Sequence, residues 1–138
     1  MSVKSYFKVK SYHTAPSAVL LILRVVAGLA MMLHGWGKIQ SPFNWMGADS
    51  SIPGVFQFLA AFSEFGGGLA WILGLLFPLA SLGILATMIV AAGFHILVNG
   101  DPFVGAGSSY ELAALYFCLS LVFLAFGPGN YSADKKIF

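Results

Sequence analysis

The stretch AVLLILRVVAGLAMML, residues 18–33, decides the fold class, because Arg24 is its only charged residue. A helix crosses the hydrocarbon core of a bilayer with about 20 predominantly apolar residues. Lysines precede the stretch, as in a signal peptide, but the only small-x-small pair near its end, Gly28-Leu29-Ala30, lies inside the apolar run. We therefore expect an uncleaved first transmembrane helix.

Three further apolar segments follow, and residues that start or stop a helix separate them. The four predicted spans are residues 16–34, 54–77, 79–98 and 111–126. Pro53 suits the first turn of the second span, Pro78 separates the second span from the third, and Gly127-Pro128-Gly129 ends the fourth. The pattern predicts an all-α fold, a four-helix transmembrane bundle, with residues 1–138 forming a single membrane domain.

The composition of the whole chain agrees with a membrane protein. The chain has 138 residues, of which 59% are hydrophobic and only 9% are charged, and its mean hydropathy is +0.87. A soluble domain carries about 25% charged residues, so a soluble domain, a disordered chain and a nucleic-acid-binding protein are excluded. The single cysteine rules out an internal disulfide, and we interpret Cys118 as a small buried apolar side chain.

Most of the lysines gather in the two tails of the chain. They are Lys4, Lys8 and Lys10 before the first span, and Lys135 and Lys136 after the last. Lysine and arginine near the ends of membrane helices favour the cytoplasmic side. Four spans return the chain to the side on which it started, so both termini are predicted to be cytoplasmic.

Two charged residues lie in the interior of the predicted spans, where a charge costs about 2.5–3.5 kcal/mol. Arg24 in the first span either extends to the headgroups or has a partner inside the bundle. Glu64 lies near the middle of the second span, and its axial offset from Arg24 is about 8 Å. We therefore expect an Arg24–Glu64 ion pair; the alternative is that Glu64 acts as a protonatable group in a low-dielectric environment.

The predicted topology brings further polar residues of three helices to a similar depth on the outer side, above Glu64. They are His34, Lys38, His95 and Glu111. We interpret Glu64, His95 and Glu111 as candidate catalytic residues, which would transfer protons. Arg24, His34 and Lys38 are candidate cofactor-binding residues. No short fixed spacing favours a metal site, and Glu111 can also simply begin a helix, where a carboxylate suits the dipole.

These residues, taken in order, resemble the motifs of the DoxX family of small bacterial membrane proteins. The motifs are Arg24 with Gly28, His34-Gly35-x-x-Lys38, Glu64-x-x-Gly67-Gly68, His95 before Asn99-Gly100, Tyr110-Glu111, and Gly127-Pro128-Gly129-x-x-Ser132-x-Asp134. The family's usual basic residue after the second span is absent, and Phe77-Pro78-Leu79 stands there instead. The resemblance implies a multi-pass protein of the bacterial inner membrane, tied to quinone-linked oxidation of sulfur compounds or to thiol and oxidative-stress systems.

These features lead to three hypotheses for the function of the protein. The first is a membrane subunit of a quinone-linked oxidoreductase; the sequence has no haem-attachment or dinucleotide motif, so a partner enzyme would supply electrons while this chain supplies a quinone site. The second is a non-catalytic anchor or assembly module for a soluble enzyme. The third is a small-solute permease, formed as a homo-oligomer along the small residues of the second span.

Overall fold

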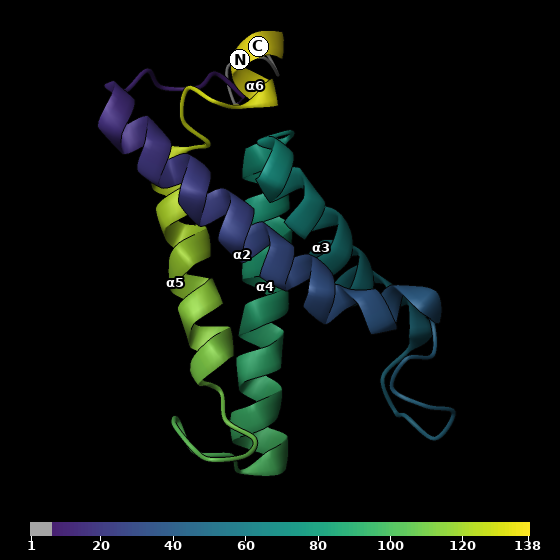
Figure 1. The fold of residues 1–138 in the computed structure, drawn as a ribbon. Coiled ribbons are helices and arrows are strands. Elements are labelled where there is room, and N and C mark those ends of the chain that lie inside the picture. The colour runs from purple at the N-terminus through teal and green to yellow at the C-terminus, as the bar shows by residue number, and fades with distance from the viewer. Residues whose placement is uncertain (1–6) are drawn as a thin grey trace.

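The computed structural model describes residues 7–138, and these residues form helices and no strand. The elements are α2 (Thr14–Gln40), α3 (Gly54–Leu73), α4 (Phe77–Phe94), the π-helix η1 (His95–Asn99), α5 (Glu111–Phe126) and α6 (Ala133–Ile137) (Figure 1). Three helical stretches are long and apolar enough to cross a membrane: Thr14–Gln40, Gly54–Leu73 and Phe77–Asn99; α5 is a shorter apolar helix. The predicted all-α transmembrane bundle is confirmed.

The helix bounds differ from the predicted spans at the turn between α3 and α4. Gly74 has a φ of 65° and caps α3, whose last residue, Leu73, lies four residues before the predicted end at residue 77. Pro78 does not separate two helices but lies in the first turn of α4, where a missing N–H costs nothing. Leu76, between them, has a φ of 47°, a conformation that an L-residue keeps only when its surroundings hold it.

Glycines let α2 and α3 pack closely. A Cβ atom on Gly28 would lie 2.6 Å from the carbonyl oxygen of Gly68, and one on Gly68 would lie 2.6 Å from the carbonyl oxygen of Gly28. A Cβ on Gly35 would lie 2.6 Å from the amide nitrogen of Phe65. Such small residues at a helix interface allow the backbones of membrane helices to approach, and they fix how the two antiparallel helices align.

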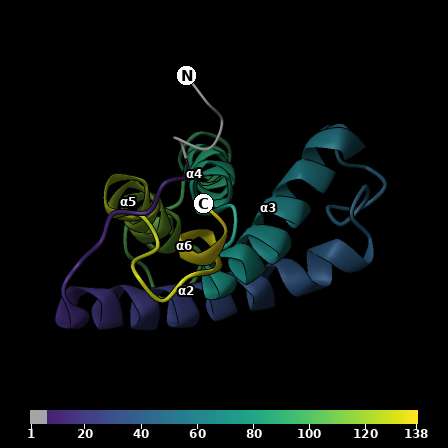
Figure 2. The ribbon, with the colours of Figure 1, turned by 90° about the horizontal axis from the view of Figure 1, so that it is seen from above.

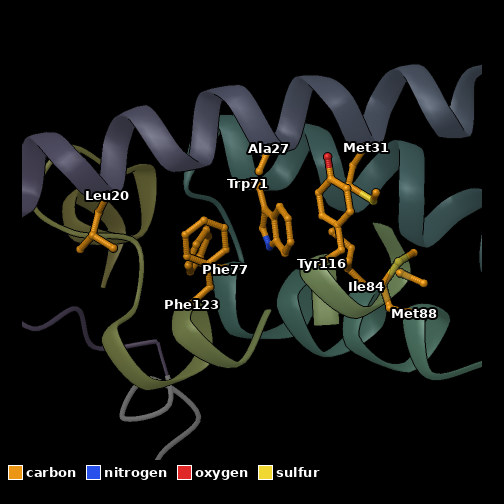
Figure 3. Close-up of a cluster of buried hydrophobic side chains, with 10 residues drawn as sticks. Leu20, Ala27, Met31, Trp71, Phe77, Ile84, Met88, Tyr116 and Phe123 are labelled. Carbon is orange, nitrogen blue, oxygen red and sulfur yellow. The ribbon is translucent and has the colours of Figure 1, made fainter. Parts of the chain in front are cut away.

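The helices α2, α3, α4 and α5 do not run parallel to one another along their whole length. The hairpin of α2 and α3 crosses α4 and α5 obliquely near the end that carries the tails, and it diverges from them toward the loop between α2 and α3 (Figures 1 and 2). The buried core lies at the crossing, where the Trp71 and Phe123 rings meet edge to face, with centroids 4.8 Å apart (Figure 3). Trp71 also donates a hydrogen bond from Nε1 to Ser81 Oγ over 3.0 Å.

The outer surfaces of the helices carry exposed apolar side chains, such as Leu33, Val90 and Leu97. Lipid tails cover such a surface, because the helices satisfy their own backbone hydrogen bonds. Cys118 belongs to this exposed group, so its prediction as a buried side chain is wrong: it lies on the outward face of α5, whereas Ala113, Tyr116, Ser120 and Phe123 form the inward face.

The described parts of the two tails fold onto one another at one end of the bundle. The Phe7 and Phe138 rings stack with centroids 4.9 Å apart. Tyr12 and Asn130 exchange two hydrogen bonds, of 3.2 and 2.6 Å, between backbone and side chain. Lys4 lies outside the described residues. Both tails therefore leave the bundle on the same side.

Candidate functional site

Arg24 is fully buried on α2 and donates four hydrogen bonds, all to backbone carbonyls. Two go to the end of α3, from Nε to Trp71 and from Nη2 to Ile72, each over 2.9 Å. The other two go from Nη1 to the C-terminal segment, to Pro128 over 2.6 Å and to Tyr131 over 3.0 Å. One guanidinium thus joins α2, α3 and the C-terminal segment.

Asp134, in the C-terminal segment, binds the turn between α3 and α4. Its carboxylate oxygens accept hydrogen bonds from the amides of Leu76, over 2.7 Å, and of Phe77, over 2.8 Å. A carboxylate at the N-terminus of a helix satisfies free N–H groups and interacts favourably with the dipole. Asp134 also acts electrostatically on Arg24. We call Arg24, Asp134 and the backbone groups that they bind the terminal hub.

The predicted Arg24–Glu64 ion pair is wrong. The antiparallel alignment of α2 and α3 sets Gly28 against Gly68 and Gly35 against Phe65, which leaves Arg24 beside the C-terminal end of α3 and places Glu64 at the opposite end of the contact. The predicted offset between Arg24 and Glu64 compared only their depths in the membrane. It did not include how α2 and α3 align with one another. The role of Asp134 was also missed, because its amide partners lie far from it in sequence.

Glu64 pairs instead with Lys38, near the end of α2. Lys38 Nζ lies 2.6 Å from Glu64 Oε1, and the Glu64 side chain is 4% exposed against 28% for Lys38. The Lys38 ammonium also lies 4.6 Å from the centroid of the Trp45 ring, within cation–π range. The other carboxylate oxygen, Oε2, is buried and has no hydrogen-bond partner among the described residues. We call these three residues the Lys38–Glu64 site.

The loop between α2 and α3 folds around Gln57 and holds this site in place. Trp45 donates from Nε1 to the Gln57 carbonyl over 2.9 Å. The buried Gln57 side chain accepts from the Met46 amide over 3.0 Å and donates to the Ile52 carbonyl over 2.9 Å. The sequence did not indicate Trp45 as a site residue; the signal that could have pointed to this loop is Gln57, a polar residue two turns before Glu64 on the same helix face. Beside this loop lies an open hollow of about 420 Å³, lined by residues 46–52 and Phe94.

His95 and Glu111 lie in another part of the molecule. The last turns of α2 are separated from η1 and the start of α5 in both views (Figures 1 and 2). His95 Nδ1 lies 2.6 Å from Asp101 Oδ2, and this hydrogen bond, with one from Asn99, holds the pKa of the Asp101 carboxyl below its ordinary value. Glu111 is the first residue of α5, and His34 is exposed on α2.

The predicted pocket therefore resolves into separate regions, because the α2–α3 hairpin diverges from α4 and α5. The structure brings Lys38 and Glu64 together, but neither has a hydrogen bond to His34, His95 or Glu111 among residues 7–138. Within the same residues, no group of three or more His, Cys, Asp or Glu side chains could hold a metal ion.

The comparisons with known proteins agree with the resemblance of the motifs. The family model DoxX matches residues 19–99, more than half of the chain. The match covers most of α2, all of α3 and α4, and η1, and therefore includes both ends of the Lys38–Glu64 site; Glu111 and the C-terminal half of the terminal hub lie beyond it. No curated protein and no solved structure matches the chain. With its apolar helices and this match, the chain is an integral membrane protein that belongs to the DoxX family.

Proposed function

We propose that this protein is the membrane subunit of a quinone-linked oxidoreductase and that the Lys38–Glu64 site receives the quinone ring. The observation that carries the proposal is Glu64 Oε2, a buried carboxylate oxygen without a hydrogen-bond partner among the described residues. Buried polar atoms in proteins are nearly always paired. An oxygen left unpaired beside a cation and an aromatic ring suits a ligand that brings its own hydroxyl.

The residues around Glu64 fit the chemistry of a quinone ring. Lys38 can donate to a ring oxygen, since its ammonium has three N–H donors and is partly exposed. Trp45 offers an aromatic surface next to it. A quinone that is reduced takes up two electrons and two protons, and its two carbonyl oxygens become hydroxyls.

Each residue then has a defined task. Lys38 orients a ring oxygen by a charge-assisted hydrogen bond, and Glu64 holds or releases the proton exchanged with that oxygen. The electrons come from a partner enzyme that oxidises a sulfur compound or acts in a thiol or oxidative-stress system, as the family resemblance implies. Proton exchange by His95 and Glu111, and quinone contact by His34, stay predictions. Arg24 is left out, because its hydrogen bonds serve the terminal hub.

The proposed location is the bacterial inner membrane, with both termini in the cytoplasm. The support is that Lys8, Lys10, Lys135 and Lys136 belong to tails that fold together at one end. Positive residues favour the cytoplasmic side. A reporter fused to residue 138 and another inserted into the loop of residues 100–110 would report opposite sides; the same side for both contradicts this topology.

The test of the quinone proposal is the amount of quinone that co-purifies with the protein after solubilisation in a mild detergent, measured by chromatography and mass spectrometry. Glu64→Gln and Lys38→Met should each lower the quinone content about tenfold, since a hydrogen bond to a charged group is lost. Asp101→Asn is the matched control, because it also changes a carboxylate to an amide but lies outside the site. A wild-type protein without quinone, or a Glu64→Gln variant that keeps it, overturns the proposal.

A non-catalytic anchor is the second candidate function, and the terminal hub favours it. The hydrogen bonds of Arg24 and Asp134 hold the C-terminal tail and the α3–α4 turn in place. They therefore give a rigid surface on the proposed cytoplasmic side. If an oxidoreductase co-purifies with the Glu64→Gln and Lys38→Met variants as well as with the wild type, and no quinone is found in any of them, the anchor function takes first place.

A further inference from the structure

The end of the molecule that carries both tails has a strongly basic surface. Lys8, Lys10, Lys135 and Lys136 are all exposed. Asp134 is the only acidic residue in the two described tails, residues 7–13 and 127–138, and it is fully buried with both oxygens accepting backbone amides. The exposed side-chain charge of this end is therefore entirely positive.

Hydrogen bonds fix two of the lysines and leave the charge of each accessible. Lys10 donates from Nζ to the Ala125 carbonyl at the end of α5, over 3.0 Å. Lys135 donates from Nζ to Ser11 Oγ over 2.7 Å and to the Val9 carbonyl over 3.3 Å. Each of these bonds links one tail to another part of the chain. The lysines are thus held by folded structure, as part of the same arrangement that stacks Phe7 on Phe138.

A small hollow of about 170 Å³ lies among these tails. Its lining includes Lys8 and Lys10, and its apolar wall includes Pro78 and the exposed Phe126. Asp134 also belongs to the lining, but both of its carboxylate oxygens accept backbone amides. Ammonium groups above an apolar wall, at the end of transmembrane helices, match a molecule with a phosphate at one end and hydrocarbon at the other. Basic pockets at the ends of membrane helices bind anionic headgroups in this way.

We propose that the hollow beside Lys8 and Lys10 binds the headgroup phosphate of an anionic phospholipid. A soluble phosphate ester offers the same anion, but the apolar wall and the position at the end of α4 and α5 favour the lipid. The proposal does not depend on the quinone site, because the Lys38–Glu64 site lies at the opposite end of the α2–α3 contact.

The test uses the full-length protein in a mild detergent and counts lipids bound by native mass spectrometry, with phosphatidylglycerol, phosphatidylcholine or glycerol 3-phosphate added. The wild type should retain phosphatidylglycerol in preference to the other two. Lys8→Gln/Lys10→Gln should weaken that retention, by about fivefold for each lysine. Lys8→Arg/Lys10→Arg, which keeps the charges, should retain the lipid.

Each other result overturns the proposal. Equal retention of phosphatidylglycerol and phosphatidylcholine means that charge does not select the lipid. Retention of glycerol 3-phosphate in place of the lipid makes a soluble anion the ligand, and undiminished lipid in the double glutamine variant places the site elsewhere. Lys8→Gln alone, which breaks no hydrogen bond that Lys8 donates to the described residues, repeats the test if loss of the Lys10 bond unfolds the double variant.

Discussion

Helix α2 carries two cationic residues, Arg24 and Lys38, about 21 Å apart along its axis. Arg24 meets the C-terminal end of α3, and Lys38 meets Glu64 in the middle of α3. At the terminal hub, Arg24 directs four hydrogen bonds to backbone carbonyls. At the Lys38–Glu64 site, a single contact of 2.6 Å joins the two charges, and one carboxylate oxygen has no partner. A buried charged group whose hydrogen bonds are all made within the protein holds segments together. A buried charged group with an unpaired atom can still form a hydrogen bond to a ligand.

The two sites also differ in what neutralises the charge. Carbonyl dipoles surround Arg24, and Asp134 acts on it from a distance, so the cation belongs to a network whose members are all paired. Glu64 depends on one side chain that is 28% exposed. Changes at the terminal hub should therefore affect stability most, and changes at the Lys38–Glu64 site should affect stability less and ligand binding more.

The largest effect is expected from Arg24→Gln. Removing the guanidinium takes a charged donor away from four carbonyls and leaves Asp134 without its countercharge, so we expect a loss of about 3–5 kcal/mol in the free energy of unfolding. Arg24→Lys should recover only part, because an ammonium lacks the planar fork of donors. Thermal unfolding in detergent measures the stability of both variants. If Arg24→Gln has the same melting temperature as the wild type, the terminal hub does not contribute more to stability than the Lys38–Glu64 site.

The next effect concerns the helix contact that positions Glu64. Gly35→Ala puts a Cβ 2.6 Å from the Phe65 amide nitrogen, so it should cost about 1–3 kcal/mol by overpacking. Gly37→Ala is the matched control, since a Cβ there meets nothing within 4 Å; it should stabilise the helix by up to about 1 kcal/mol. Equal melting temperatures for the two variants would contradict the close approach of α2 and α3 at Gly35.

A smaller effect is expected from a double-mutant cycle at the Lys38–Glu64 site. Lys38→Met and Glu64→Gln should each destabilise the protein, and the double variant should recover about 1–2 kcal/mol, because Lys38 is partly screened by solvent. The matched cycle combines Arg24→Gln with Glu64→Gln, and its two losses should add within about 0.5 kcal/mol. If the losses were coupled for Arg24 and Glu64 but additive for Lys38 and Glu64, the Arg24–Glu64 ion pair would be correct after all.

The smallest effect is a pH dependence at the partly buried His95–Asp101 contact. The hydrogen bond from His95 lowers the pKa of Asp101 from its ordinary value of 3.8. A lowered pKa in the folded state means that the stabilisation is present above the ordinary value and is lost as the pH falls through the lower folded value. The melting temperature of the wild type should therefore fall more steeply in acid than that of Asp101→Asn. Parallel curves would mean that the contact adds no stability.

Local properties of the sequence were enough for the fold class. The apolar runs and their stop residues predicted four helices, the fourth over residues 111–126 as found, and the ordered motifs indicated the DoxX family before the family match. Arg24 and Glu64 were also recognised as costly, because a charge in an apolar run is visible without a structure. Which groups satisfy those charges was not visible.

The tertiary structure decided those partners for two physical reasons. The alignment of α2 and α3 depends on where glycines allow two backbones to meet, and a displacement of a few residues along either helix exchanges one ion pair for another. The partners of Arg24 and Asp134 are backbone carbonyls and amides, which nearly every residue possesses, so no residue type marks them in a sequence. Hydropathy thus determined what crosses the membrane, and helix packing determined which charges are satisfied and which stay available.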